Sequence, residues 1–135
     1  MFLFIEVLFL KLLTYMLHFM ALIRIKDLLI RTIIGFNPDE RKNRQDVLIN
    51  IEIEVNTRKA IETDESEGIY DYKAITKQVI SLVQESEFNL LERLTHEILT
   101  LIMNDKRVMR ARVEVDKPHA LRFAESVSVV MEEQR

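Results

Sequence analysis

Hydrophobic and polar residues alternate along four stretches of the chain, and a period of two residues is typical of β-strands. These stretches are residues 23–31, 48–55, 108–116 and 126–132. In the clearest of them, isoleucine or valine occupies every second position from 49 to 55, with asparagine or glutamate in between. We expect such a strand to bury one face and to turn the other toward a polar environment.

Two stretches between the second and third of these strands repeat apolar residues at the spacing of an α-helix. The first follows Asp71, a good N-cap residue, and is expected to run to about Glu87. The second is expected to run from about Leu90 to Asn104. The predicted inward positions are Ile75, Val79, Leu82 and Val83 in the first helix and Leu91, Leu94, Ile98, Leu101 and Ile102 in the second.

The element order is therefore β-β-α-α-β-β, which predicts an α+β fold with a four-stranded, mostly antiparallel sheet and both helices on one face. The opposite face would carry polar residues, so it faces either water or the inside of an oligomer. Four strands leave two open edges, and closing several subunits into a barrel would remove them. We expect the polar stretches 40–46 and 62–68 to be solvated surface loops.

The first 20 residues differ from the rest, because they are apolar apart from Glu6, Lys11, Thr14 and His18. We therefore divide the chain into a hydrophobic leader, 1–20, and one domain, 21–135. Three interpretations of the leader remain open. It is sequence upstream of a true start at Met16 or Met20, or a membrane anchor, or an extra packed helix. As an anchor it would place Lys11 near the bilayer centre, at a cost of about 2.5–3.5 kcal/mol.

The composition of the chain excludes several kinds of functional site. A net charge of −3 gives no basic field for nucleic acid, and the absence of cysteine excludes disulfides, thiolate catalysis and cysteine metal sites. It also fits a reducing compartment, and we expect a cytoplasmic protein. Two glycines cannot form a dinucleotide-binding loop, and the domain holds only His96 and His119. We therefore expect neither a metal nor a cofactor.

Acid–base chemistry by carboxylates, a lysine and a tyrosine remains. Glu40 follows a turn, Tyr72 and Glu92 begin helices, and Lys117 ends a strand just before Pro118. Each residue also has an ordinary structural explanation: a loop carboxylate, a core aromatic, a helix-dipole partner or a solvated strand end. The residues alone leave these alternatives open.

From about Leu22 onward, the chain resembles the dihydroneopterin aldolase and dihydroneopterin triphosphate 2′-epimerase family, which has the tunnelling fold. The resemblance rests on Ile34-Gly35 before Glu40, Tyr70-Asp71-Tyr72, Phe88-Asn89-Leu90-Leu91-Glu92-Arg93, and Lys117-Pro118-His119-Ala120. Arg24-Ile25-Lys26-Asp27-Leu28, Asn43-Arg44-Gln45-Asp46 and His119-Ala120-Leu121-Arg122 are more similar to the epimerase branch. The aromatic residue and tryptophan that aldolases usually carry before the glutamate are missing.

The resemblance implies roles for individual residues. Glu92, with the backbone amides around Leu90 and Leu91, would hold the pterin ring. Lys117 would be the catalytic lysine, Tyr72 its partner in proton transfer, and Glu40 the carboxylate that orients Lys117 or water. The triphosphate would need cations near the side-chain end of the pocket, with His119 and Arg122 nearest and Arg41, Lys42 and Arg44 next.

The implied reaction is a retro-aldol cleavage without metal or Schiff base, followed by re-addition that inverts C2′. The expected partners are a small dihydropterin substrate and other copies of the chain, in a tetramer or octamer with active sites between subunits. Alternatives are an aldolase that releases glycolaldehyde, and a non-catalytic pterin-binding or membrane-tethered module. Membrane association is expected only if the leader is real.

Overall fold

A computed structural model describes residues 1–135 and contains one antiparallel sheet with its strands in the order β1-β2-β3-β4. The strands are β1 (Met20–Thr32), β2 (Gln45–Asn56), β3 (Val108–Lys117) and β4 (Val127–Gln134). All four predicted strands are confirmed. The first two extend further at both ends than the alternation indicated, because β1 and β2 pair from Met20 opposite Asn56 to Thr32 opposite Gln45.

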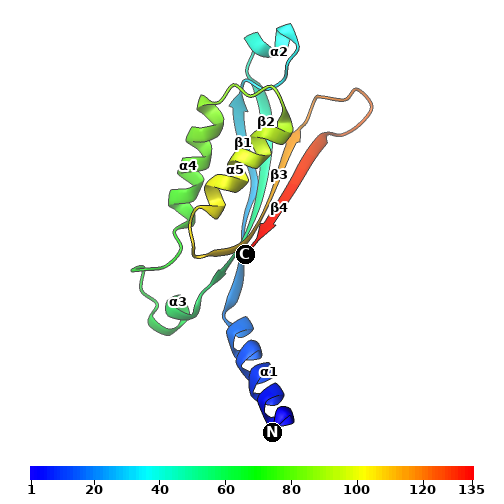
Figure 1. Cartoon of the computed structure of the whole chain (residues 1–135). Helices are drawn as coiled ribbons and strands as arrows, with labels where there is room; N and C mark the ends of the chain where they lie inside the picture. The colour runs from blue at the N-terminus through cyan, green and yellow to red at the C-terminus, as the bar shows by residue number, and fades with distance from the viewer.

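Helices α4 (Tyr72–Glu85) and α5 (Leu91–Met103) lie side by side on one face of the sheet (Figure 1). The Asp71 side chain caps α4 by accepting hydrogen bonds from the backbone N–H groups of Lys73 and Ala74, both at 3.0 Å. The predicted order β-β-α-α-β-β and the α+β class are therefore confirmed. The chain also forms two short helices that the pattern did not predict, α2 (Pro38–Lys42) and α3 (Arg58–Thr63), and its leader forms α1 (Phe2–His18).

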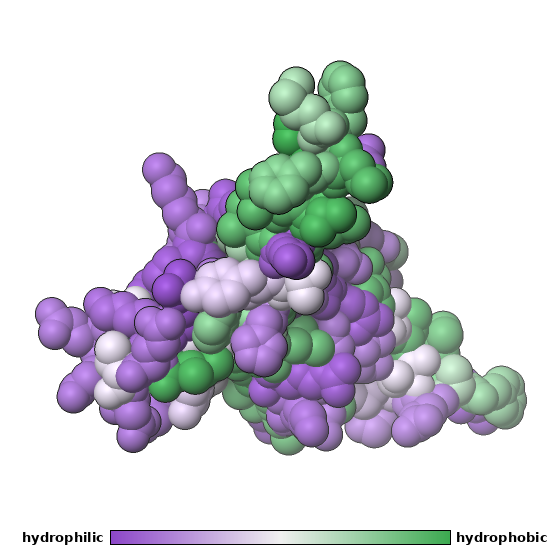
Figure 2. Space-filling view, turned by 90° about the horizontal axis from the view of Figure 1, so that it is seen from below, coloured by the Kyte–Doolittle hydropathy of each residue, from purple (hydrophilic) through white to green (hydrophobic).

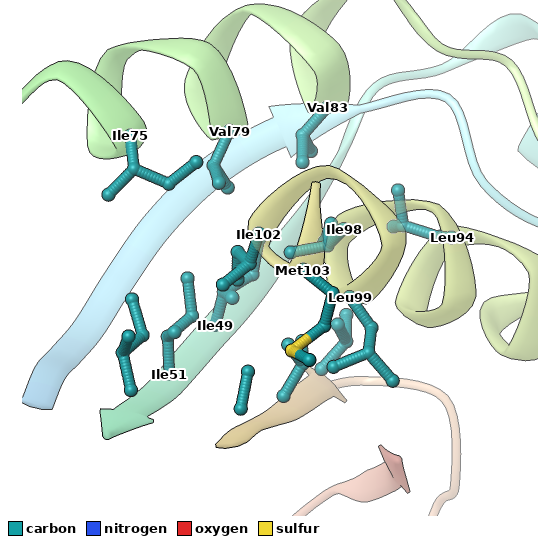
Figure 3. Close-up of a cluster of buried hydrophobic side chains, with 14 of the residues drawn as sticks. Ile49, Ile51, Ile75, Val79, Val83, Leu94, Ile98, Leu99, Ile102 and Met103 are labelled. Carbon is teal, nitrogen blue, oxygen red and sulfur yellow. The ribbon is translucent and has the colours of Figure 1, made fainter. Parts of the chain in front are cut away.

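The core lies between the two long helices and the inner face of the sheet (Figure 3). Every second residue of β2 from Val47 to Val55 is at most 2% exposed. The helices add Ile75, Val79 and Val83 from α4 and Leu94, Ile98 and Ile102 from α5. The other predicted inward residues, Leu82, Leu91 and Leu101, are only partly buried and pack at the margin of this cluster.

The opposite face of the sheet is polar, as predicted, and its charges pair across strands. Arg110 forms ion pairs with Glu132 at 2.8 Å and with Glu54 at 3.2 Å. Glu52 lies 3.4 Å from Arg24. No helix covers this face, and β1 and β4 keep open edges (Figure 1). A single chain therefore has two open sheet edges, as expected from its four strands. A barrel of several subunits would close these edges.

The stretch 40–46 is not the solvated loop that its charges suggested. Its first residues belong to α2 and its last begin β2, so only two residues connect the two elements. The Arg41 side chain donates hydrogen bonds to three backbone carbonyls, which a freely solvated arginine would not do. The second polar stretch, 62–68, begins inside α3 and is a surface loop only after that helix ends at Thr63.

The apolar leader forms α1, which extends away from the sheet and buries none of its residues (Figure 1). Seen from below, its side chains form an apolar projection above a largely hydrophilic surface (Figure 2). Within one chain, therefore, it is not a packed helix. No helix of this chain combines the length and the hydropathy that crossing a bilayer requires.

Candidate active site

An ion pair joins two of the predicted site residues, Lys117 and Glu40, which are 77 positions apart in the sequence. Lys117 Nζ donates to Glu40 Oε2, and the two side chains are 15% and 20% exposed. The hydrogen bond from Lys117 lowers the pKa of Glu40 below its ordinary value, and a hydrogen bond from Gln45 contributes in the same direction. Glu40 is thus held ionised, and it fixes the position of Nζ at the end of β3.

Gly35 makes room for this carboxylate. Its φ of +114° lies in a region that L-residues rarely adopt, and a Cβ atom there would collide with the carboxylate of Glu40. Gln45 supports the same group, because its Nε2 donates to Glu40 Oε2 at 3.3 Å and to the Ile34 carbonyl at 2.8 Å. The turn and the first residue of β2 therefore position Glu40 together.

Arg41 connects this turn to the segment that precedes α5. It donates to the carbonyls of Gly35 at 2.9 Å, Glu87 at 2.8 Å and Phe88 at 3.2 Å. The Gly35 N–H also donates to the Phe88 carbonyl, at 3.4 Å. These bonds place the start of α5 beside the turn that carries Glu40.

The first turn of α5 carries the predicted ring anchor. Glu92 is its acidic residue, and it is exposed to solvent. Leu90 occupies the N-cap position without a side-chain cap, so the first N–H groups of the helix have no acceptor within it. A carboxylate beside free amides can bind a ring that carries both donors and acceptors. Leu90 is half exposed and Leu91 is partly buried.

His119 and Arg122 lie on the connection between β3 and β4, immediately after Lys117. Both are exposed. The Arg122 guanidinium lies 5.7 Å from the centre of the Phe123 ring, and Phe123 itself is 97% exposed. Ser126 closes the base of the loop by donating to Asp116 at 2.7 Å. The two predicted phosphate contacts therefore project from the end of the sheet that holds Lys117.

Tyr72 lies at the other end of the sheet. It starts α4, is 52% exposed, and lines a cavity together with Val55 and Arg107. Val55 pairs with Val108 at the beginning of β3, whereas Lys117 ends that strand. Ten residues of β-strand span roughly 30 Å. Within one chain, the structure does not bring Tyr72 to Lys117.

The cavity beside Tyr72 has a volume of about 400 Å³. Its charged lining residues are Lys59, Lys106 and Arg107. Tyr70 also lines it, and the Tyr70 hydroxyl is buried without a hydrogen-bond partner. Burial, followed by the nearby Asp105 carboxylate, raises the pKa of Tyr70 to about 12. The Tyr70 phenol therefore stays neutral at physiological pH.

The sequence did not reveal the positioning roles of Arg41 and Gln45. The sequence predicts Arg41 to be a loop cation or a phosphate contact, but its guanidinium donates to three backbone carbonyls. Arg44 is likewise bonded to the carbonyls of Arg31 and Gln84. Only the place of Arg41 directly after Glu40 could have signalled a shared site. No three His, Asp or Glu side chains come together as metal ligands.

The protein-family model for dihydroneopterin aldolase (FolB) matches residues 23–132, which leaves α1 outside the match. A dihydroneopterin triphosphate 2′-epimerase from Pseudomonas aeruginosa is 53% identical over 112 residues, covering 83% of this chain and 91% of the relative. A dihydroneopterin aldolase from Escherichia coli is 29% identical, covering 84% of this chain and 93% of the relative.

Solved structures agree with the sequence comparison. The crystal structure of E. coli dihydroneopterin aldolase in complex with neopterin superimposes with a TM-score of 0.79. It is 28% identical, and the match covers 84% of this chain and 98% of the other. The predicted tunnelling fold is thereby confirmed. The ion pair at the end of β3, the helix start beside it and the match over residues 23–132 lead to one conclusion: this chain belongs to the dihydroneopterin aldolase (FolB) family.

Proposed function

We propose that this chain catalyses epimerisation at C2′ of 7,8-dihydroneopterin triphosphate, giving 7,8-dihydromonapterin triphosphate. The observation that carries the proposal is the Lys117–Glu40 ion pair beside the N-terminus of α5, which bears Glu92. The difference in identity supports the epimerase over the aldolase, because the P. aeruginosa epimerase is 53% identical and the E. coli aldolase 29%.

Glu92 accepts two parallel hydrogen bonds from the pterin ring N–H and the exocyclic amine in this proposal. Free amides around Leu90 and Leu91 complete the ring site. These interactions point the C1′–C2′ bond toward Lys117. Glu40 positions the Lys117 amine, and Lys117 ends a strand whose alternate residues belong to the core.

The reaction begins with removal of the 2′-hydroxyl proton, and the C1′–C2′ bond then breaks. The electron pair moves into the dihydropterin ring, which becomes an enamine-like species, and C2′ becomes the aldehyde carbon of the retained phosphorylated fragment. Rotation of that fragment exposes its other face. Re-addition of C1′ and return of the proton invert C2′. Lys117 and Tyr72 carry the proton, which is the task of general acid–base groups.

This chemistry needs Tyr72 and Lys117 together, although one chain separates them by the length of β3. We therefore propose that the site forms between subunits of a homo-oligomer, with Tyr72 supplied by the neighbouring copy. The open edges of β1 and β4 support an assembly that closes the sheet.

A mixing experiment tests the shared site. Lys117→Ala and Tyr72→Phe proteins are each expected to be inactive alone. When they are unfolded together and reassembled, about one site in four should combine an intact Lys117 with an intact Tyr72 from the other variant. Recovery of activity supports a shared site. A mixture that stays as inactive as its parents would contradict it.

Product analysis tests the activity itself. The whole chain is incubated with dihydroneopterin triphosphate and, separately, with dihydroneopterin. We expect the 2′-epimer of the triphosphate as the main product. If neither substrate were converted by the assembled protein, the proposal would fail.

Aldolase activity is the second candidate, because the matching family model is that of dihydroneopterin aldolase. An aldolase protonates C1′ and releases the aldehyde before it can add back. Fast release of glycolaldehyde from dihydroneopterin, with little epimer from either substrate, would assign this activity instead.

A further inference from the structure

The cavity beside Tyr72 contains positive charge that the chain itself does not neutralise. Of the residues that line it, those with a formal charge are Lys59, Lys106 and Arg107, and all three are basic. This contrasts with the whole chain, whose net charge is −3. A cavity with only cationic charges is suited to an anion.

The three cations are not equivalent. Arg107 is neutralised by Asp105, with Nη2 at 2.6 Å from a carboxylate oxygen, and it also donates to the Ile69 carbonyl at 2.7 Å. Neither Lys59 nor Lys106 forms an ion pair in the chain. The two lysines are therefore the cavity charges that remain available to a ligand.

Lys59 has a defined place in this cavity. Its amine lies against Gly68, so close that a Cβ at that position would come within 2.6 Å of Nζ. Gly68 has a φ of +72° and connects the acidic loop to the cavity wall. The carboxylates of that loop, from Asp64 to Glu67, are not among the lining residues. The Lys59 amine and Gly68 therefore line the same part of the cavity wall.

The cavity wall also contains an unsatisfied polar group. Tyr70 is 9% exposed, and its hydroxyl has no hydrogen-bond partner in the chain. Native proteins rarely leave a buried hydroxyl unpaired. Tyr72 lines the same cavity, so a ligand that contacts Tyr72 enters a space already lined by two free ammonium groups.

From this arrangement we infer that Lys59 and Lys106 bind the phosphate groups of the substrate. The two lysines would form the phosphate subsite next to Tyr72. The inference rests on the proposed function, in which Tyr72 reaches the reacting carbon from the neighbouring subunit. The phosphates follow that carbon along the substrate side chain, so they lie on the Tyr72 side. His119 and Arg122 of the first subunit then face the same phosphates from the other side.

The test compares the double variant Lys59→Ala/Lys106→Ala with a control, Lys77→Ala, which removes an exposed lysine of α4 that does not line the cavity. For dihydroneopterin triphosphate, we expect the double variant to lose about 100-fold in kcat/KM, because a hydrogen bond to a charged group accounts for roughly tenfold each. For unphosphorylated dihydroneopterin, kcat/KM should stay within about twofold. Lys77→Ala should match the unmodified chain on both substrates.

Two results would overturn the inference. Unchanged kcat/KM on the triphosphate would place the phosphates elsewhere, and Arg122→Ala would then be the variant that loses activity. An equal loss on both substrates would assign the lysines to the fold or to the chemical step.

Binding of inorganic tripolyphosphate, measured by calorimetry, separates this inference from the proposed function because it needs no turnover. We expect binding to the assembled chain and to Lys77→Ala, with loss in the double variant. Such a pattern in a protein without epimerase activity would keep the phosphate subsite and reject the proposed reaction. Unchanged binding in the double variant would reject the subsite, whatever the activity.

Discussion

The two ends of the sheet are built differently. At the end where β3 finishes, Lys117, Glu40, Gln45 and Arg41 satisfy one another or nearby carbonyls. At the end where β3 begins, Tyr72 is half exposed, the Tyr70 hydroxyl has no partner, and two lysines of the cavity are unpaired. The four side chains named at the first end are paired within the chain, and those named at the second are not, so we call these the complete and the incomplete end. This difference is what a site shared between copies requires.

The largest expected effect comes from Lys117→Ala. Removing an acid–base group should lower kcat for the triphosphate substrate by about 10²–10⁴-fold. The fold should survive, because Lys117 ends a strand and contributes nothing to the apolar core. Steady-state kinetics together with circular dichroism would show both results. A variant that retained more than a tenth of the activity would remove Lys117 from the chemistry.

Arg41→Ala tests whether the complete end depends on the link between the α2 turn and the start of α5. The change removes the Arg41 donors from three carbonyls, of which only that of Phe88 keeps another donor, the Gly35 N–H. We therefore expect a loss of about 2–3 kcal/mol in the free energy of unfolding. KM should rise as Glu92 loses its fixed position relative to Lys117. Chemical denaturation and kinetics measure the two effects.

Lys77→Ala is the control, since Lys77 is exposed on α4, lies outside the site and forms no ion pair. If Lys77→Ala and Arg41→Ala were equally stable and equally active, the positioning role of Arg41 would be refuted.

Glu40→Gln tests the ion pair through its dependence on pH. The pKa of Glu40 is lowered in the folded chain, so its ionised form stabilises the fold above the unfolded pKa, and this contribution is lost as pH falls through the folded value. We expect the variant to be less stable than the unmodified chain by about 1 kcal/mol at pH 7. The difference should shrink below pH 4.5, the ordinary value for this group.

Thermal unfolding at pH 7 and at pH 3 would measure that change. If the stability difference is the same at both pH values, the ion pair with Lys117 does not hold Glu40 in its ionised form.

The smallest expected effect is that of Tyr70→Phe at the incomplete end. Because the hydroxyl has no partner, its removal should leave the free energy of unfolding unchanged or raise it by up to about 1 kcal/mol. Denaturant unfolding of the two proteins gives this number. A clear loss of stability, of about 1 kcal/mol or more, would mean that the hydroxyl has a partner in the assembled protein.

The sequence predicted the regular elements well and the irregular ones poorly. The alternation in 48–55 and the helical spacing around Val79 and Ile98 depend on burial against one face, which a period in the sequence reports directly. Helices α2 and α3 have five and six residues, too few for a period to emerge. Charged residues at 41–44 favoured a solvated loop, whereas the arginines there use their donors on carbonyls from distant segments.

By itself, the sequence determined the order of the elements, the buried face of each, the family and the candidate residues. The elements and their buried faces follow from the local spacing of apolar residues. The family and the candidate residues follow from short motifs and their order along the chain. Only the tertiary structure decided which candidates meet: Lys117 reaches Glu40 across 77 positions, while Tyr72 lies at the far end of the same sheet. The reason is physical. Contacts between distant segments follow from strand register and helix direction, and no local pattern of residues encodes the distance between two ends of a strand.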